Sequence, residues 1–210
     1  MAGFAEIELT PAVARAVVRG DREAVAGAYR VLVQAVMNLA ARILQDRQLA
    51  EEVVQDTFVE LLEKSKQIKD HRAVVPWVRR VAVNHCLMRL RSPWHARRDA
   101  LEPEQLDTVT ASDDGGVEWA GNSSAMGRAL GQLSGDARAV LWLHDVEGYT
   151  HKEIGELMGK TTSFSKSQLA RAYERLVQWQ ESRIPERVRS AQPEKLQMKE
   201  TGHETPAILH

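Results

Sequence analysis

The chain has 210 residues and a formal net charge of -1 at pH 7, and this length suits one or two small domains with a core each. The balanced charge excludes a globally basic nucleic-acid-binding protein, so any contact with DNA must come from local groups of cations. The single cysteine, Cys86, excludes an intramolecular disulfide and a metal site built from several cysteines.

The sequence shows no targeting or membrane segment. Residues 1–10 lack the basic segment and apolar core of a secretory signal, and the longest apolar stretch, residues 31–44, is interrupted by polar side chains. We expect no membrane insertion, and the lone cysteine fits a cytoplasmic protein. His85 lies beside Cys86, but neighbouring residues of a helix point about 100° apart, so we expect a packed histidine and neither a metal nor another cofactor.

Apolar residues recur at helical spacing, and no alternating strand pattern lasts beyond a few residues. The sequence therefore predicts an all-α protein, with two small helical domains joined by a flexible acidic linker. Asp21 can cap a first helix, whose inner stripe comprises Val25, Ala28, Tyr29, Leu32, Val36, Leu39 and Ile43. Asp46 can open a second, whose inner stripe comprises Ala50, Val53, Val54, Thr57, Phe58, Leu61 and Leu62. Pro76, favoured in a first turn, begins a third that continues to about Arg91.

The outer face of the second predicted helix is acidic. Its acids follow one another at spacings of three or four residues and comprise Glu52, Asp56, Glu60 and Glu63, with Glu51 and Gln55 beside them. Like charges so placed destabilise an isolated helix by about 0.2–0.5 kcal/mol per pair. A basic partner surface would reverse this cost, whereas salt would screen the repulsion on a merely solvated face. The residues alone leave both interpretations open.

Residues 71–98 have the opposite character, with seven arginines and no Asp or Glu. On the third predicted helix, one narrow angular sector holds Trp77, Arg80, Asn84 and Arg91. Such a surface can hold phosphates and stack on, or hydrogen-bond to, an unpaired base. Trp77 is ambiguous, because the same angle can bring its ring into the core.

The helical pattern stops in residues 99–124, where seven acids occur without a single Lys or Arg. This composition predicts an acidic linker. Helices resume near Met126 and end near Arg189. The tail, residues 190–210, has few apolar residues and two prolines, and we expect it to be disordered.

Residues 148–176 predict a helix-turn-helix. Thr150 and Glu153 can form a capping box at the start of a short helix, because each side chain can bond to the backbone of the other residue. One face of this helix is apolar and holds Ile154, Leu157 and Met158, and Gly159 supplies the left-handed residue that ends it.

A second helix of this unit follows within a few residues. Its inner face is expected to hold Leu169, Ala172, Tyr173 and Leu176, and its outer face Phe164, Ser167, Gln168, Arg171 and Arg175. Gln can pair with adenine, and Arg with guanine or phosphate, so the outer face suits the major groove of DNA. An ordinary helical hairpin with a solvated polar face would show the same pattern.

These parts in this order resemble a bacterial sigma factor of the extracytoplasmic function (ECF) group, in the sigma-70 family. Residues 19–24 (RGDREA) resemble the opening of that family's first conserved region, and residues 46–58 (DRQLAEEVVQDTF) its polymerase-binding helix, the most specific motif in the chain. Residues 76–84 (PWVRRVAVN) are similar to the segment that engages the minus-ten promoter element. Residues 141–172 are similar to the region that reads the minus-35 element.

The resemblance implies a protein that binds core RNA polymerase and promoter DNA, helps to melt the minus-ten region and performs no bond-making chemistry. It implies polymerase contacts from Glu51, Glu52, Gln55 and Asp56, minus-ten contacts from Trp77, Arg80, Asn84 and Arg91, and minus-35 contacts from Phe164, Lys166, Ser167, Gln168, Arg171 and Arg175. Residues 66–73 would line the pocket for a flipped base of the non-template strand. The linker would thread near the active site and RNA exit path.

The implied domains are residues 1–98, like sigma region 2, and residues 125–189, like sigma region 4, with the linker 99–124 between them and the tail 190–210 after them. Members of the family are commonly held inactive by an anti-sigma factor, which is a candidate partner here. Others are controlled by an extension or by phosphorylation, and the sequence does not choose among these modes. Gln168 stands where the family usually has Arg, so the promoter sequence is not implied.

Two functions of other kinds stay open at the level of sequence. A dimeric helix-turn-helix regulator would bind duplex DNA alone, at a symmetric site. A helical adaptor would bind only protein and would lack salt-dependent affinity for DNA. We expect no catalytic residues, because no paired carboxylates, nucleophile with a base, or phosphate-binding glycine loop stands out.

Overall fold

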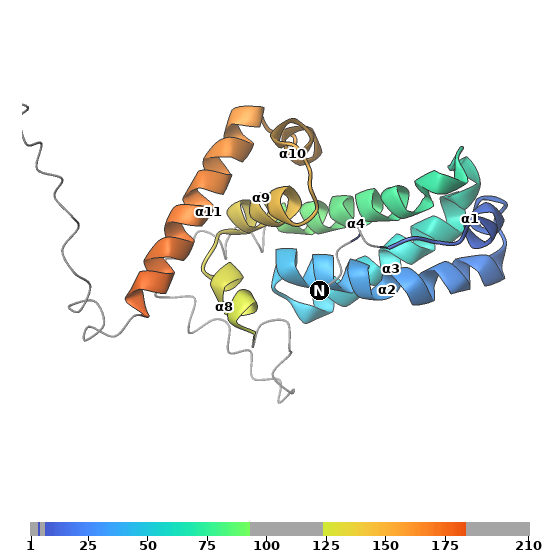
Figure 1. Cartoon of the computed structure of the whole chain (residues 1–210), viewed down its shortest axis with the longest axis horizontal. Helices are drawn as coiled ribbons and strands as arrows, with labels where there is room; N and C mark the ends of the chain where they lie inside the picture. Colours follow the sequence, from blue (N-terminus) through green and yellow to red (C-terminus); the bar gives the residue numbers. More distant parts are fainter. Residues whose placement is uncertain (1–3, 5–6, 93–123, 184–210) are drawn as a thin grey trace, which may run out of the picture.

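The computed structural model describes residues 4, 7–92 and 124–183, and within these ranges every regular element is a helix. The first group comprises α1 (Pro11–Val18), α2 (Arg22–Leu44), α3 (Arg47–Lys64) and α4 (Val74–Leu90), with the 3-10 turns η2 (Ser65–Gln67) and η3 (His71–Ala73) before α4 (Figure 1). The second comprises α8 (Ala125–Gly131), α9 (Gly135–Asp145), α10 (His151–Met158) and α11 (Thr162–Ser182). The all-α prediction is confirmed. The predicted linker and tail lie outside the described residues, apart from Ser124.

Capping side chains set the start of α2 and α3. The Asp21 carboxylate accepts a hydrogen bond from Glu23 N at 2.9 Å, and the Asp46 carboxylate accepts one from Leu49 N at 3.0 Å. Both predicted caps are confirmed. Between the helices, Gln45 adopts a left-handed conformation with φ 54°, which ends α2. The chain therefore reverses within Gln45 and Asp46, and α3 returns along α2 (Figure 1).

Two residues predicted on the inner stripes are exposed instead. Tyr29 of α2 is 43% exposed, and Leu62 of α3 is 44% exposed. Both lie along the open side of the seam between α2 and α3, where the Tyr29 ring meets Phe58 edge-on at 4.8 Å between centroids. The prediction was wrong at these margins because periodicity locates the centre of an apolar stripe, not the line at which the neighbouring helix stops covering it.

The helix α4 completes the first group. The Asp70 carboxylate accepts from Arg72 N at 2.9 Å and fixes η3, and α4 follows directly from Val74, slightly before the predicted start at Pro76. Cys86 is buried on the face of α4 that packs on α2 and α3. Burial raises the pKa of its thiol to about 12, so Cys86 is an unreactive packing residue.

The helix α9 is the centre of the second group. Ser134 caps it by accepting from Ala137 N at 3.3 Å. Most of its residues are buried, because it packs against α10 and α11 on one side and against α2 and α4 on the other. Because α9 is buried on most sides and contacts helices of both groups, it links the two groups.

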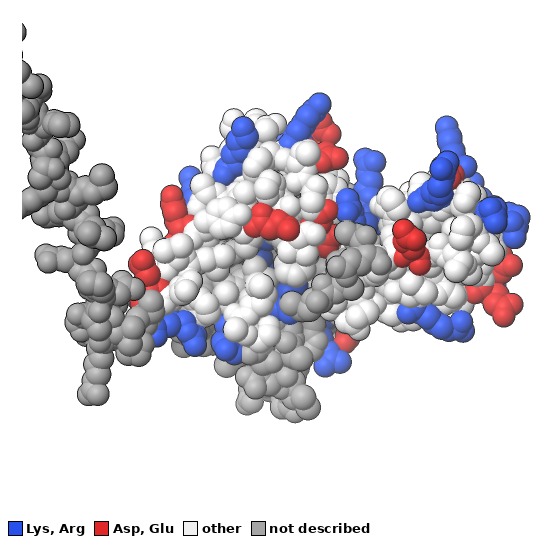
Figure 2. Space-filling model, in the orientation of Figure 1, with Lys and Arg blue, Asp and Glu red and all other residues white. Residues whose placement is uncertain are grey.

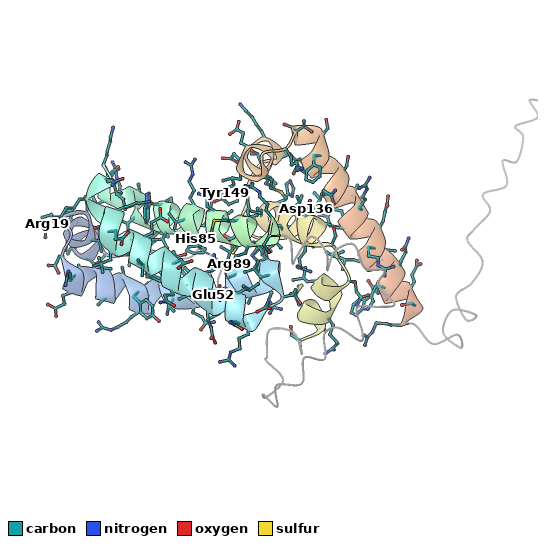
Figure 3. The ribbon with its side chains drawn as sticks, turned by 180° about the vertical axis from the view of Figure 1, so that it is seen from behind. Arg19, Glu52, His85, Arg89, Asp136 and Tyr149 are labelled. Carbon is teal, nitrogen blue, oxygen red and sulfur yellow. The ribbon has the colours of Figure 1, made fainter. Side chains whose placement is uncertain are left out.

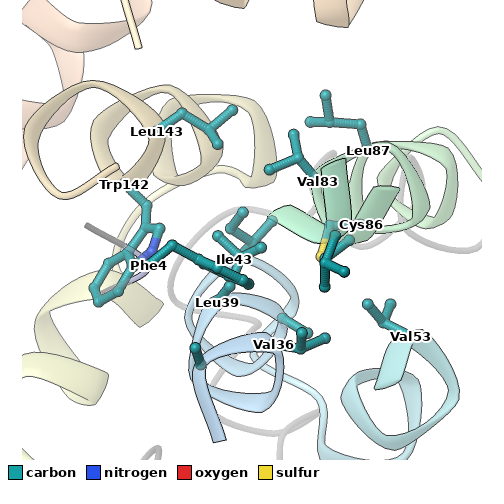
Figure 4. Close-up of a cluster of buried hydrophobic side chains, with 14 of the residues drawn as sticks. Phe4, Val36, Leu39, Ile43, Val53, Val83, Cys86, Leu87, Trp142 and Leu143 are labelled. Atoms are coloured by element: carbon teal, nitrogen blue, oxygen red, sulfur yellow. The ribbon is translucent and has the colours of Figure 1, made fainter. Parts of the chain in front are cut away.

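The two groups share one apolar core. Leu143 of α9 faces Val83 and Leu87 of α4, and Trp142 stands beside Phe4 from the N-terminal segment (Figure 4). All five side chains are buried. The two groups are therefore packed against each other in this structure.

Polar contacts support the same boundary. Arg138 of α9 donates through Nε to the Ile43 carbonyl oxygen at 2.7 Å, near the C-terminal end of α2, where carbonyls have no partner within the helix. Arg42 of α2 donates to Ser124 Oγ at 3.2 Å, just before α8. By length and composition α2 is apolar enough to cross a bilayer, but its apolar side packs on α1, α3, α4 and α9, as the core helix of a folded bundle does.

Candidate nucleic-acid interface

The start of the helix-turn-helix is fixed by the predicted capping box. Thr150 N donates to Glu153 Oε2 at 2.8 Å, and Glu153 N donates to Thr150 Oγ1 at 3.3 Å. The hydrogen bonds from the Thr150 hydroxyl and backbone hold the pKa of the Glu153 carboxyl below its usual range. At the other end of α10, Gly159 adopts φ 65° and ends the helix, as predicted.

Close backbone approach shapes the turn between α10 and α11. A Cβ on Gly155 would lie 3.0 Å from the Lys160 carbonyl oxygen and 3.1 Å from the Thr161 carbonyl carbon. Only glycine lets the turn come this near to α10 without a shift of the backbone. Thr161 then caps α11 by accepting from Phe164 N at 3.1 Å. The sequence pattern did not single out Gly155, because this need follows from the packing of the two helices.

The open face of α11 carries cations and a hydroxyl. Lys166, Ser167 and Arg171 are exposed, whereas Arg175 is half-buried further along the helix. Phe164 is also half-buried, with part of its ring packed on the core. Exposed Lys and Arg can neutralise phosphates, and Ser and Arg can bond to base edges in the major groove. This face can therefore bind duplex DNA.

Two side chains of α11 lie elsewhere than predicted. Gln168, expected on the outer face, is only 9% exposed, and Tyr173, expected on the inner face, is 48% exposed. The buried arc is centred near Ala172, roughly 60° around the helix from Leu169, on which the prediction was centred. The arc is displaced because α11 packs on α8 and α9 as well as on α10. The prediction of an outward-facing Gln168 was wrong.

A polar cluster ties together the three helices of this unit. The rings of His144 and His151 stack with centroids 4.5 Å apart, and His151 Nδ1 lies 3.0 Å from Ser165 Oγ on α11. His144 Nδ1 lies 2.8 Å from Asp145 Oδ1, and Tyr173 Oη donates to Asp145 Oδ2 at 2.8 Å. This last bond holds Tyr173 along the surface. Burial, followed by the neighbouring His144, lowers the pKa of His151.

The sector of α4 predicted to contact the minus-ten element lies beside α10. Arg80 and Asn84 are exposed, and Trp77 is half-buried with its ring packed against the core. Arg80 and Asn84 line a cleft of about 520 Å³, part of whose wall comes from α10. Arg91 Nη2 donates to the Leu157 carbonyl oxygen at 2.9 Å. Unlike the open face of α11, this sector faces another part of the chain.

The acidic face of α3 is partly neutralised within the chain. Arg89 of α4 bonds to Asp56 Oδ2 at 2.6 Å and lies 3.5 Å from Glu52 Oε2, and His85 Nε2 lies 3.1 Å from Glu60 Oε2 (Figure 3). These three acids lie on the solvent side of α3, as predicted, but at the seam with α4, which leaves them only partly exposed. His85 is a packed histidine, as predicted. Part of the repulsion on α3 is thus offset by its own neighbouring helix.

The open side of α3 combines polar residues with an apolar groove. Glu51 and Gln55 are exposed, and they border a groove of about 490 Å³ between α2 and α3. The other side chains that line it are apolar and comprise Tyr29, Val33, Met37, Val54, Phe58, Val59 and Leu62. An exposed apolar patch with a polar rim is typical of a surface that binds another protein. Sequence periodicity missed this groove because it forms only where the two helices pack.

The basic side chains of the described residues fall into separate groups on the one face that Figure 2 shows. On the face seen in Figure 2, Lys and Arg project over α10 and the beginning of α11, and again at the end of the first group that is farthest from α11. Fold and surfaces together define the class: an all-helical DNA-binding protein with a helix-turn-helix and a second, arginine-bearing helix.

Sequence comparison identifies the family. The family model described as Sigma-70 region 2 matches residues 28–96, and that described as Sigma-70, region 4 matches residues 123–176. The RNA polymerase sigma factor CarQ of Myxococcus xanthus is 27% identical over 145 residues, which cover 67% of this chain and 80% of the relative. The ECF RNA polymerase sigma factor SigE of Mycolicibacterium smegmatis is 30% identical over 145 residues, 67% of this chain and 55% of the relative.

A third relative, the ECF RNA polymerase sigma factor SigM of Mycobacterium tuberculosis, is 29% identical over 159 residues, 76% of this chain and 78% of the relative. Among solved structures, the sigma factor RpoE from Bartonella quintana, in complex with the anti-sigma factor NepR, matches with a TM-score of 0.49 and 20% identity, over 74% of this chain and 95% of that one. The chain belongs to the sigma-70 family, in its ECF group, and is a sigma factor that directs transcription initiation. The resemblance seen in its motifs is confirmed, and the alternative of a dimeric regulator is not favoured.

Proposed function

We propose that the two helical groups divide the work of this sigma factor, residues 1–98 binding core polymerase and the minus-ten element and residues 125–189 binding the minus-35 element. The observation that carries the proposal is the open face of α11, where Lys166, Ser167 and Arg171 are exposed on a helix-turn-helix with its cap, turn and core in place. Arg175 and Phe164 lie at the border of that face. Gln168, being buried, contributes to packing.

The polymerase-binding surface is proposed on the open side of α3. Glu51 and Gln55 supply exposed polar groups, and the apolar groove beside them can receive side chains of a partner helix. Glu52 and Asp56 add half-exposed carboxylates that Arg89 already holds in place. A partner that is basic and partly apolar suits this combination of charges and groove.

The minus-ten surface is proposed on α4. Arg80 and Asn84 are exposed and can hold phosphates or base edges, Arg91 adds a second guanidinium, and the half-buried Trp77 offers one ring edge or face. The work requires binding and melting of DNA, not catalysis. We place the protein in the cytoplasm, where polymerase and promoters are, and we regard an anti-sigma factor as a candidate partner.

Transcription with purified components tests this function. Core polymerase, the chain and fragmented genomic DNA of the native cell should give transcripts whose 5′ ends share upstream motifs and depend on the chain. The double change Glu51→Lys with Gln55→Lys should abolish co-elution with core polymerase and these transcripts, while Glu63→Lys, an exposed charge reversal on the same helix, should preserve both. The same 5′ ends with and without the chain would contradict the proposal.

A further inference from the structure

We propose that Lys66 binds a phosphate of the promoter DNA beside the minus-ten surface, and that Gly20 is the residue that positions this lysine. Lys66 belongs to η2, which packs on α1 at the end of the first group that is farthest from α11 (Figure 1). The turns η2 and η3 lead into α4, on whose proposed minus-ten role this inference rests. Lys66 would hold the backbone of the DNA, in addition to the base contact expected of residues 66–73.

Gly20 ends α1 in a left-handed conformation, with φ +82°. Gly20 N donates to the Val17 carbonyl oxygen at 2.8 Å, and Asp21 N donates to the Ala16 carbonyl oxygen at 3.1 Å. These are the two hydrogen bonds of a Schellman motif, in which the left-handed residue is usually glycine and sometimes asparagine. The end of the helix therefore explains the backbone conformation at this position, but it does not by itself require the absence of a side chain.

The close approach of Lys66 supplies that requirement. A Cβ on Gly20 would lie 2.4 Å from Lys66 Cε and 3.3 Å from Lys66 Cγ, so any side chain here would displace the lysine. Gly148 and Gly159 are also left-handed, yet a Cβ on either would meet nothing within 4 Å. The carbon chain of Lys66 thus lies across the bare backbone of the turn, next in sequence to Arg19.

The backbone of Lys66 is held as well as its side chain. Ser65 is 1% exposed and Ile68 is 4% exposed, and Ile68 N donates to the Ser65 carbonyl oxygen at 3.1 Å. A lysine that is free in solvent loses much of its rotamer freedom when a ligand orders it. Because Lys66 already lies along Gly20, part of that freedom is lost before binding. The side chain is therefore preorganised to bind an anion.

The surroundings of Lys66 are cationic, and Lys and Arg project at this end of the first group (Figure 2). Arg19 and Lys66 are exposed, and neither forms an ion pair with a residue that the structure describes. Nearby acids are engaged: Asp21 accepts from backbone N–H groups of α2, and Asp70 bonds to Arg72 at 3.2 Å. Hydrogen bonds from Arg72 hold the pKa of the Asp70 carboxyl below its usual range. An anionic partner would relieve the repulsion between the open cations.

DNA is the anion that suits this place. Arg80 of the proposed minus-ten surface lies six residues after Val74, the first residue of α4, or about 9 Å along the helix axis. Phosphates of one strand of B-form DNA are about 3.4 Å apart along its axis, so a few nucleotides span this distance. A lysine binds phosphate as a point charge and carries no sequence information. Lys66 should therefore add affinity without changing promoter preference.

The salt dependence of DNA binding tests the phosphate contact. The holoenzyme is titrated with labelled promoter fragments, chosen from those whose transcripts depend on the chain. Lys66→Ala should weaken binding roughly fivefold for all these promoters alike, and should lower the slope of log affinity against log salt by about one. Lys64→Ala, whose lysine pairs with Glu60 on α3, is the matched control and should change neither. A purely structural role of Lys66 would alter stability but not the slope.

Gly20→Asn tests the positioning role. Asparagine tolerates the left-handed turn, so circular dichroism should show unchanged helix content, while its Cβ displaces Lys66. The affinity and slope should match those of Lys66→Ala, and the double variant should lose no more, since the lysine that Gly20 positions is then absent. Additive losses, or wild-type affinity in Gly20→Asn, would overturn the role of Gly20. Lys66→Ala keeps the phosphate contact testable if Gly20→Asn does not fold.

Failure of the proposed function would be seen separately, as absence of co-elution with core polymerase or of chain-dependent transcripts. In that case the free chain is titrated with a labelled single strand of mixed sequence, because a phosphate contact does not depend on sequence. Lys66→Ala should then lower the slope by about 0.7. A slope equal to that of the wild type would overturn the phosphate contact. Loss of polymerase co-elution in Lys66→Ala, with DNA binding by the free chain unchanged, would overturn it too and would assign Lys66 to an acidic protein surface.

Discussion

The helices α11 and α4 are both predicted to contact DNA, and they use their cations differently. α11 presents Lys166 and Arg171 to solvent, on a helix positioned by its own cap and turn. On α4, Arg89 is bonded to carboxylates of α3, and Arg79 and Arg91 are bonded to carbonyls of the second group. An arginine-rich segment without acids is thus not automatically a DNA surface, because packing can convert its guanidiniums into cross-links.

Charge reversal on α11 should give the largest effect. The pair Lys166→Glu and Arg171→Glu should cost about 1–3 kcal/mol of promoter binding at each position, or at least a thirtyfold loss of promoter-dependent transcription. Polymerase co-elution should be retained, because neither residue lies on the proposed polymerase surface. Arg183→Glu, the same reversal at the far end of α11, is the matched control. Equal activity of the two proteins would remove α11 from the minus-35 assignment.

A pair of arginines within α4 sharpens the contrast. Arg89→Met should lower the free energy of unfolding by about 1–2 kcal/mol, since it strands the half-exposed carboxylates of Asp56 and Glu52. Arg80→Met, at an exposed position, should change stability by less than about 0.5 kcal/mol yet reduce promoter melting. Urea denaturation and permanganate footprinting of the holoenzyme measure the two properties. Similar losses of stability in both variants would contradict the difference in role between Arg89, which stabilises the fold, and Arg80, which contacts DNA.

The burial of Gln168 leads to a smaller effect. Gln168→Met, which fills a similar volume, should change stability by less than about 1.5 kcal/mol and leave the order of promoter preference unchanged. Ser167→Ala, at the neighbouring exposed position, should alter that order. Transcription from a library of minus-35 sequences ranks the promoters. A changed promoter ranking for Gln168→Met would indicate that Gln168 contacts a base, contrary to what its burial implies.

The histidine stack predicts the mildest effect, a dependence of stability on pH. Burial, then His144 and Lys166, lower the pKa of His151 from its ordinary value of 6.5, and Asp145 opposes them. Below that value the unfolded chain binds more protons than the folded one, so the free energy of unfolding should fall as the pH drops from 7.5 to 5.5. His151→Gln should flatten the slope in urea denaturation. The same slope in the variant would exclude His151 as its source.

The features that the sequence could predict are local ones. Asp21, Asp46 and Thr150 cap helices through bonds to residues two or three positions away, and Gly159 ends α10 through its own backbone. Such contacts are contained within one window of sequence. The centres of the apolar stripes follow from the same windows.

The features that the sequence could not predict depend on how the helices pack against one another. The buried arc of α11 is displaced by α8 and α9, which turns Gln168 inward and leaves Tyr173 at the surface. Asp56 of α3 pairs with Arg89 of α4, which lies more than thirty positions away in the sequence. The groove between α2 and α3, and the hydrogen bonds of Arg79 to Tyr149 and Glu147, form only where separate parts of the chain are placed side by side. Periodicity within one helix contains no such information.

Photo-crosslinking from the two helices tests most directly whether this chain reads promoters through two surfaces, one on the open face of α11 and one on α4 beside α10. A photoreactive residue in place of Arg171 should crosslink to duplex DNA at the minus-35 position in the holoenzyme, and one in place of Arg80 to the minus-ten region of the non-template strand. Without core polymerase, the label at position 80 should crosslink to the chain's own second helical group and not to DNA. Equal crosslinking of position 80 to promoter DNA with and without polymerase would contradict the account.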